Sequence, residues 1–250
     1  MDMAQRLDKL VASQGTGSRS EARRCIWSGK VTVDGTVCRD PSAKVEPEQQ
    51  TIAIAGRCIR YQPYRYIMLN KPPGILCVSR DPKVKTVVDL VPEPLRKKGL
   101  FPAGRLDKDT VGLVLLTDDG AYAHRLLSPR KHVEKCYHVL VDGAVLPEHI
   151  DAFRRGTGLQ DGTVCRPARL RVLEDGEHPL AEVVITEGRY HQIKRMFAAV
   201  GRHVLWLKRV SIGGLALDEK LKEGECRELT EPEKEAVFSG LPYNFCEKCP

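Results

Sequence analysis

The hydrophobic and polar positions of the first 48 residues follow two helices and a hairpin. Apolar residues recur at helical spacing from 6 to 13, and glycines at 15 and 17 then stop the pattern. The next helix is predicted to begin at Ser18, because Glu21 three residues later completes the spacing of a capping box. Alternation on both sides of Asp34-Gly35 predicts a β-hairpin, since this dipeptide favours a tight two-residue turn.

From residue 64 onward the pattern changes to short apolar runs separated by turns. Helices are few and unevenly spaced, so neither a βαβ barrel nor a doubly wound sheet is expected. We predict an α+β fold, in which a small N-terminal α/β module precedes a domain built on a mainly antiparallel sheet. The expected strands lie within residues 65–74, 112–120, 135–143, 180–188 and 203–217, and the expected helices within 191–201 and 230–238.

These patterns divide the chain into four segments. The N-terminal module occupies residues 1–48, a linker of weak pattern follows at 49–63, the main domain covers 64–240, and a tail forms residues 241–250.

Composition narrows the class of protein only moderately. The 250 residues carry 40 Lys and Arg against 33 Asp and Glu, and the net charge of +7 is compatible with a polyanionic partner without requiring one. The nine cysteines show no short, even framework, so free thiols in a reducing cytoplasm are expected. Cys246 and Cys249 lack the two nearby ligands that would complete a zinc site, so no metal is expected. We expect neither a signal peptide nor a membrane span.

Basic side chains gather in three stretches. The helix from Ser18 carries one group, the residues before Tyr137 carry another, and the densest group lies between Glu187 and Arg209, where Tyr190 and Trp206 are interleaved with cations. Cations beside aromatic rings suit RNA, whose phosphates need positive charge and whose unstacked bases need π surfaces, although solvated helix faces also carry such charges. We expect RNA contacts from Arg19, Arg23, Arg24, Lys30, Arg130, Lys131, Arg202, Lys208 and Arg209.

Arg105 and Asp107 stand in a turn directly before the apolar run 111–116. Asp107 is by itself compatible with a turn or a salt bridge. A hydrolase with paired carboxylates would have to combine it with Asp118 or Asp119, which lie at the opposite end of an extended strand and therefore too far away. Phosphate-loop, dinucleotide-binding and serine-nucleophile motifs are absent.

The segment "GRLDKDTVGLVLLTDDG" resembles the signature of pseudouridine synthases of the RsuA type almost along its whole length. "YIMLNKPPG", "SPRKHVEKCYHV", "EGRYHQIKRMFAAVGRHV" and "RVSIGGLAL" resemble the companion motifs of that family, in the same order, over residues 64 to about 236. Residues 3 to about 48 resemble the small RNA-binding module of a small-subunit ribosomal protein, in which the second helix contacts RNA.

The resemblance implies roles for individual residues. Asp107 matches the essential aspartate, which acts as a nucleophile on the sugar or as a base that drives glycal formation. Lys194 matches its basic partner, and Tyr137 the tyrosine that packs on the uracil and helps to take the C5 proton. Arg105 matches the arginine that helps displace the target base, and Leu207 an apolar residue of the pocket floor. From the basic stretch between Glu187 and Arg209 we also expect Arg189, His191 and Arg195 to contact the substrate.

The implied activity is isomerisation of a uridine in small-subunit (16S) ribosomal RNA to pseudouridine, a step in ribosome biogenesis. The reaction transfers no electrons or groups between molecules, so no cofactor is expected. We expect a monomer that acts on ribosomal RNA within a small-subunit assembly intermediate. A large-subunit (23S) synthase and a non-catalytic ribosome-assembly factor are the alternatives.

Overall fold

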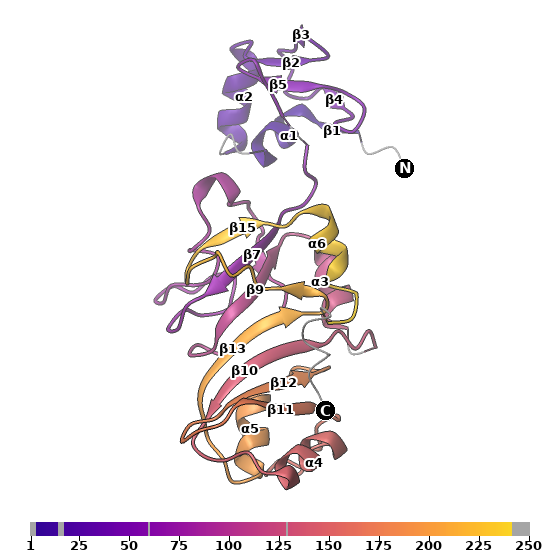
Figure 1. Ribbon diagram of the computed structural model, residues 1–250. Coiled ribbons are helices and arrows are strands. Elements are labelled where there is room, and N and C mark those ends of the chain that lie inside the picture. Colours follow the sequence, from indigo (N-terminus) through magenta and orange to yellow (C-terminus); the bar gives the residue numbers. More distant parts are fainter. Residues whose placement is uncertain (1–3, 15–17, 60, 129, 242–250) are drawn as a thin grey trace. The chain divides into compact units, whose positions relative to one another are not determined.

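The computed structural model describes residues 4–14, 18–59, 61–128 and 130–241, which form two compact units. The first unit comprises the residues up to Arg65 together with 92–99, and the second comprises 66–91 and the chain from Leu100 onward. Helices and strands of both units are labelled in Figure 1. In the described part of the chain, no helix is both long enough and apolar enough to cross a bilayer.

The first unit has the two helices and the hairpin that the sequence predicts. Its helices pack against each other around the buried Leu7, Leu10 and Ile26. Both central residues of the hairpin turn, Asp34 and Gly35, have positive φ angles of 51° and 81°, as this type of tight turn requires. Its elements are β1 (Gln5–Arg6), α1 (Leu7–Ser13), α2 (Arg19–Trp27), β2 (Val31–Val33), β3 (Thr36–Val37), β4 (Lys44–Val45), β5 (Ile52–Ile54) and β6 (Arg57–Cys58).

The prediction of a linker at 49–63 is wrong for most of that stretch. β5 pairs with β2 and β6 pairs with β5, which completes a four-stranded sheet in the order β3-β2-β5-β6. Ile52 lies in the core of the unit and Ile59 packs against it. Strands of two or three residues have too few alternating positions to show the period of a strand, which is why the sequence pattern missed them.

The second unit is built on one large sheet, in the order β11-β12-β10-β13-β9-β7-β15. β14 pairs with β13, and β8 pairs with β9. The predicted mainly antiparallel sheet is confirmed, with β9 and β13 as a parallel pair. The strands are β7 (Tyr66–Lys71), β8 (Phe101–Pro102), β9 (Val111–Thr117), β10 (Lys135–Val141), β11 (Arg169–Glu174), β12 (Leu180–Ile185), β13 (Val204–Ile212), β14 (Leu215–Ala216) and β15 (Cys226–Glu228).

Gly112 makes the parallel pairing possible at the start of β9. A Cβ atom at this position would lie 2.3 Å from the backbone oxygen of Arg209 on β13, and the φ angle of +96° also disfavours any other residue. The close approach fixes the first residues of β9 against β13. Because the Asp107 loop leads directly into β9, the same approach positions that loop.

Helices lie near both ends of the sheet (Figure 1). In the part of the chain that is described, they are α3 (Gly120–Leu127), α4 (Pro147–Arg155), α5 (Gln192–Ala199) and α6 (Glu231–Ala236), and a short 3-10 helix, η1, spans Glu93–Leu95 in the first unit. The ring of Phe153 on α4 contacts that of Phe197 on α5 at a centroid distance of 5.0 Å. The sequence pattern predicted α5 and α6 and missed α3 and α4.

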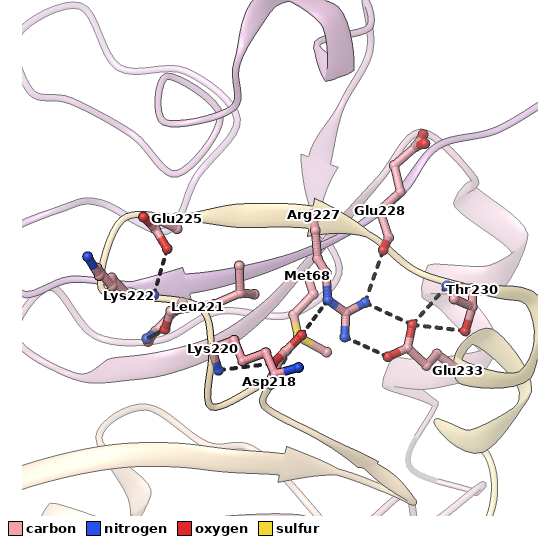
Figure 2. A network of polar contacts seen from close by, with 11 residues as sticks. Met68, Asp218, Lys220, Leu221, Lys222, Glu225, Arg227, Glu228, Thr230 and Glu233 are labelled. Atoms are coloured by element: carbon pink, nitrogen blue, oxygen red, sulfur yellow. Dashed lines mark hydrogen bonds and ion pairs between the residues drawn. The ribbon is translucent and has the colours of Figure 1, made fainter.

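Arg227 connects β15 to α6. Figure 2 shows its guanidinium between Asp218, at 2.7 Å, and Glu233, whose two oxygens accept at 2.7 and 2.9 Å. Glu233 also accepts from the backbone N–H of Thr230 at 2.8 Å, which confirms the predicted capping box. The Arg227 guanidinium is the main reason that the pKa of the Glu233 carboxyl falls to about 2.

Candidate active site

The second unit contains a pocket of about 540 Å³ beside the parallel pair β9–β13. Its lining comes from residues 76–78, the segment 103–108 with Thr110, the end of α3, positions on β10, β12 and β13, and the turn 188–191 with the start of α5. The lining residues extend from Leu76 to Ile212 in the sequence, and the fold brings them together. The pocket is therefore a product of the tertiary fold.

Asp107 lies in the loop at this pocket with its side chain 25% exposed. Its Oδ1 is 3.6 Å from Nε2 of His191, and its Oδ2 is 3.8 Å from Nζ of Lys194. Arg105, exposed two residues earlier, lines the same pocket. The Asp107 carboxylate thus faces the side-chain nitrogens of His191 and Lys194 at the pocket, where it is positioned to act as a nucleophile or a base.

Lys194 binds a second carboxylate more closely than Asp107. Its Nζ donates to both oxygens of Asp109, at 2.7 and 2.6 Å, and this contact is the main reason that the pKa of Asp109 is lowered. The sequence analysis did not select Asp109. The available signal was its position two residues after Asp107 in the same loop, but the partner on α5 was not visible in the sequence.

Lys71 holds the same loop from within the protein. Its side chain is completely buried, and its Nζ donates to the backbone oxygens of Pro72, Lys108 and Thr110 at 3.1, 3.0 and 2.8 Å. Two of these acceptors flank Asp109. Burial lowers the pKa of Lys71.

Tyr137 and Leu207 lie in the wall of the pocket and are almost completely buried. Tyr137 on β10 lies opposite Arg209 on β13, and Leu207 lies opposite Val139, so both side chains belong to the same pair of strands. A buried aromatic ring beside an apolar residue suits a flat, uncharged face of a ligand.

The turn before α5 forms the exposed edge of the pocket. The ring of Tyr190 is stacked on that of His191, with centroids 3.9 Å apart and planes 17° apart, although Tyr190 is 76% exposed. His191 has a left-handed backbone with φ of 49°. Arg189, which also lines the pocket, donates to Glu187 at 3.1 Å. An exposed aromatic pair beside a cation is typical of a surface that stacks bases.

Comparison with known proteins identifies the chain. Residues 65–199, more than half of the sequence, match the family described as RNA pseudouridylate synthase, and residues 5–50 match the S4 domain. The chain belongs to the RNA pseudouridylate synthase family. This result confirms the family and the enzyme class that the motifs around Asp107 implied.

Individual relatives match almost the whole length of this pseudouridylate synthase. It is 44% identical to the uncharacterized RNA pseudouridine synthase YtzG of Bacillus subtilis, over 91% of this chain and 96% of the relative. It is also 44% identical to the ribosomal small subunit pseudouridine synthase A of Escherichia coli K12, over 93% of this chain and 99% of the relative. A crystal structure of a pseudouridylate synthase aligns with a TM-score of 0.65 and 38% identity, covering 94% of this chain and 100% of the other.

Two of the predicted site residues in the pseudouridylate synthase do not lie where the sequence analysis expected them. Arg195 points to Asp161, with which it forms an ion pair, and it does not line the pocket. Arg209 was expected on an RNA-binding surface, but it is only 2% exposed and its Nε donates to the backbone oxygen of Leu113 at 2.8 Å. β13 is a central strand, so its inward positions are buried whatever their charge.

The other basic residues of this unit differ in exposure. Arg130 and Lys131 are exposed after α3. Arg202 and Lys208 are half-buried, and Nε of Arg202 donates to the backbone oxygen of Ala144 at 2.9 Å. These side chains keep exposed parts that are compatible with phosphate contacts.

The arginines of the S4 domain surround a buried carboxylate. Asp8, whose side chain is 0% exposed, accepts from Arg6, Arg19 and Arg23 at 3.0 to 3.2 Å. The hydrogen bond from Arg6 is the main reason that the pKa of Asp8 is strongly lowered. One carboxylate thus orients three guanidinium groups, while Arg24 and Lys30 are exposed.

Proposed function

We propose that the protein isomerises a uridine in small-subunit (16S) ribosomal RNA to pseudouridine. The observation that carries this proposal is the position of Asp107, which lies between His191 and Lys194 in a pocket that also contains the buried ring of Tyr137. The small-subunit substrate is supported by the similarity to ribosomal small subunit pseudouridine synthase A of Escherichia coli over almost the whole chain.

In the proposed reaction Asp107 breaks the bond between C1′ and N1, either by attacking C1′ or by removing a proton so that a glycal forms. The electron pair of the broken bond stays on the uracil. The base then turns and C5 forms a bond to C1′. In this step the bond from Asp107 to C1′ breaks or, on the glycal route, the proton that Asp107 removed returns to the sugar. The proton of C5 then leaves while N1 gains one. Atoms and electrons balance without a cofactor.

We assign the other residues of the pocket to binding and proton transfer. Tyr137 packs on the uracil and helps to remove the C5 proton, and Leu207 excludes water that would hydrolyse the intermediate. Arg105 fills the space that the flipped nucleotide leaves, since extrusion costs a few kcal/mol that new contacts must offset. Arg189 and His191 bind the RNA next to the target.

The expected partner is ribosomal RNA in a small-subunit assembly intermediate, bound by a monomer in the cytoplasm. The exposed Arg24 and Lys30 of the S4 domain and Arg130 and Lys131 of the second unit supply phosphate contacts. Arg19 and Arg23 do so from the positions in which Asp8 holds them.

The test is to map pseudouridine, by a chemical adduct that stops reverse transcription, in small-subunit and large-subunit RNA incubated with the wild type or with Asp107→Asn. We expect one new stop in the small-subunit RNA, absent with Asp107→Asn, whose RNA affinity stays within a few-fold of wild type.

Stops only in large-subunit RNA would support the proposed reaction but show that the substrate is large-subunit RNA. Pseudouridine formation by Asp107→Asn would overturn the assignment of the aspartate. Intact RNA binding without any stop, on free RNA and on assembly intermediates alike, would favour a non-catalytic assembly factor.

A further inference from the structure

Lys135 is a pocket residue to which the proposed reaction assigns no role. It lies on β10 two positions before Tyr137, and it lines the same pocket. Its neighbours across the sheet are Ile185 on β12 and Ile212 on β13, which also line the pocket. Lys135 is half-buried and has an apolar residue beside it on each neighbouring strand.

Lys135 uses one of its three hydrogen-bond donors. Its Nζ donates to the backbone oxygen of Val133 at 2.8 Å, and it forms no ion pair with any carboxylate among the described residues. An ammonium group has three donors and loses part of its hydration inside a pocket, so two donors of Lys135 remain for a ligand.

Arg209 is a second cation of the same pocket. It lies opposite Tyr137 on the neighbouring strand and lines the pocket, although it is 2% exposed. Its Nε is bound to the oxygen of Leu113, but Nη2 is buried and has no hydrogen-bond partner in the structure. In the part of the chain that is described, Arg209 forms no ion pair.

A half-buried lysine and a buried arginine, both with unused donors, favour a ligand that brings acceptor atoms and negative charge. The apolar walls and the ring of Tyr137 fit a flat heterocycle better than a phosphate, which needs several polar contacts and is strongly hydrated. The uracil of the proposed reaction is such a heterocycle. When its bond to C1′ breaks, N1 keeps the electron pair, and the negative charge is shared with the carbonyl oxygens O2 and O4.

We propose that Lys135 and Arg209 donate hydrogen bonds to the carbonyl oxygens of the uracil and stabilise the anion formed when it leaves the sugar. This inference rests on the proposed function and names the groups that make the base a better leaving group. The two residues transfer no proton: they bind charge that develops during cleavage, as the donors of an oxyanion hole do. When C5 bonds to C1′ and N1 is protonated, the charge disappears and the product is released from them.

The surroundings of Lys135 predict a pH dependence. Burial, and secondarily the charge of Arg209, lower the pKa of the Lys135 ammonium to about 8. The strands on either side of it contribute Ile185 and Ile212 at the paired positions. The other titratable or charged groups that line the pocket are Cys77, Arg105, Asp107, Lys108, Tyr137, Arg189, Tyr190, His191 and Arg209. Above pH 8 Lys135 becomes neutral, so cleavage slows as the pH rises through this value.

The experiment compares single-turnover pseudouridine formation by the wild type, Lys135→Met and Lys135→Arg, with RNA affinity measured in parallel. Lys135→Met is expected to lower the rate about 100-fold, the typical loss for one donor of an oxyanion hole, with RNA affinity within threefold. Lys135→Arg keeps a charge at all pH values used, so its rate should not fall between pH 7.5 and 9.5 as the wild-type rate does.

Lys234→Met is the matched control, because this lysine is also mostly buried, at 19% exposure, but pairs with Glu231 on α6 outside the pocket. Its rate should equal that of the wild type. A rate for Lys135→Met within threefold of wild type, or the same alkaline loss in wild type and Lys135→Arg, would overturn the inference. If Lys135→Met does not fold, the pH profile of Lys135→Arg decides. Failure of the proposed function would instead appear as an inactive wild type.

Discussion

Lys71 connects the buried core to the loop that carries Asp107. Because the backbone oxygens of Pro72, Lys108 and Thr110 all accept from its ammonium, one side chain supports the loop on two sides. We regard it as a positioning residue, since it does not line the pocket.

Replacing Lys71 with methionine is expected to lower the free energy of unfolding by roughly 2–4 kcal/mol, because buried carbonyls lose a charged donor. The single-turnover rate should fall as well, since the loop is no longer held. Chemical denaturation and rate measurements check both effects, and Lys222→Met, at an exposed position, is the control. Equal stability of Lys71→Met and wild type would show that the loop is held by other contacts.

Tyr137 is expected to combine packing with proton transfer. Tyr137→Phe keeps the buried ring and removes the hydroxyl, so RNA affinity should be retained while removal of the C5 proton slows. A deuterium isotope effect at C5 that appears or grows in Tyr137→Phe measures this step directly. Wild-type rates in Tyr137→Phe would leave the tyrosine with a packing role alone.

Among the secondary-structure elements, α6 depends on a network of charges rather than on its own length of six residues. Arg227 binds Asp218 and Glu233, and Glu233 caps the helix at Thr230 (Figure 2). An isolated helix of this length is unstable in water. The cap and the ion pairs of Arg227 therefore supply the stability that intrinsic helix propensity does not provide.

This network predicts a loss of stability in acid. The pKa of Glu233 is about 2 in the folded protein against an ordinary value of 4.5, so the unfolded chain binds this proton first as the pH falls. The contribution, about 1–3 kcal/mol after allowance for partial exposure, is complete above pH 4.5 and lost as the pH falls through 2.

Glu233→Gln removes the titrating group, so its free energy of unfolding should vary less between pH 5 and 2 than that of the wild type. Denaturant titrations at a series of pH values measure the difference. Parallel pH curves for the two proteins would assign the acid sensitivity to other carboxylates, of which Asp8 and Asp218 also have lowered pKa values.

For the whole molecule, the net charge of +7 and the exposed cations of both units predict strongly salt-dependent RNA binding. The logarithm of the affinity should fall linearly with the logarithm of the salt concentration. Replacing Arg24 and Lys30 by glutamine should reduce this slope by about 2, one for each phosphate contact, without changing the rate at saturating RNA. Lys220→Gln, at another exposed position, should leave the slope unchanged. An unchanged slope in the double variant would show that the RNA phosphates contact residues other than Arg24 and Lys30.

Features that depend on residues a few positions apart were accessible from the sequence. The capping boxes at Ser18 and Thr230, the turn at Asp34-Gly35 and the buried strand after Asp107 all formed as predicted. Each depends on local hydrogen bonds or on the period of a single element. The motif around Asp107 likewise indicated the family, because it is one continuous segment.

Features that depend on distant partners came from the three-dimensional packing. Lys194 is 85 residues from Asp109, and Arg209 is 96 residues from Leu113. No local pattern shows that Lys194 prefers Asp109 at close range, or that Arg209 on a central strand is buried. β5 and β6 likewise acquire their conformation from the strands beside them. Short sequence motifs thus identify the residues that carry the chemistry of the pocket. The sheet determines the partner and the burial of each charged residue, because strand pairing decides which distant side chains lie in the same low-dielectric site.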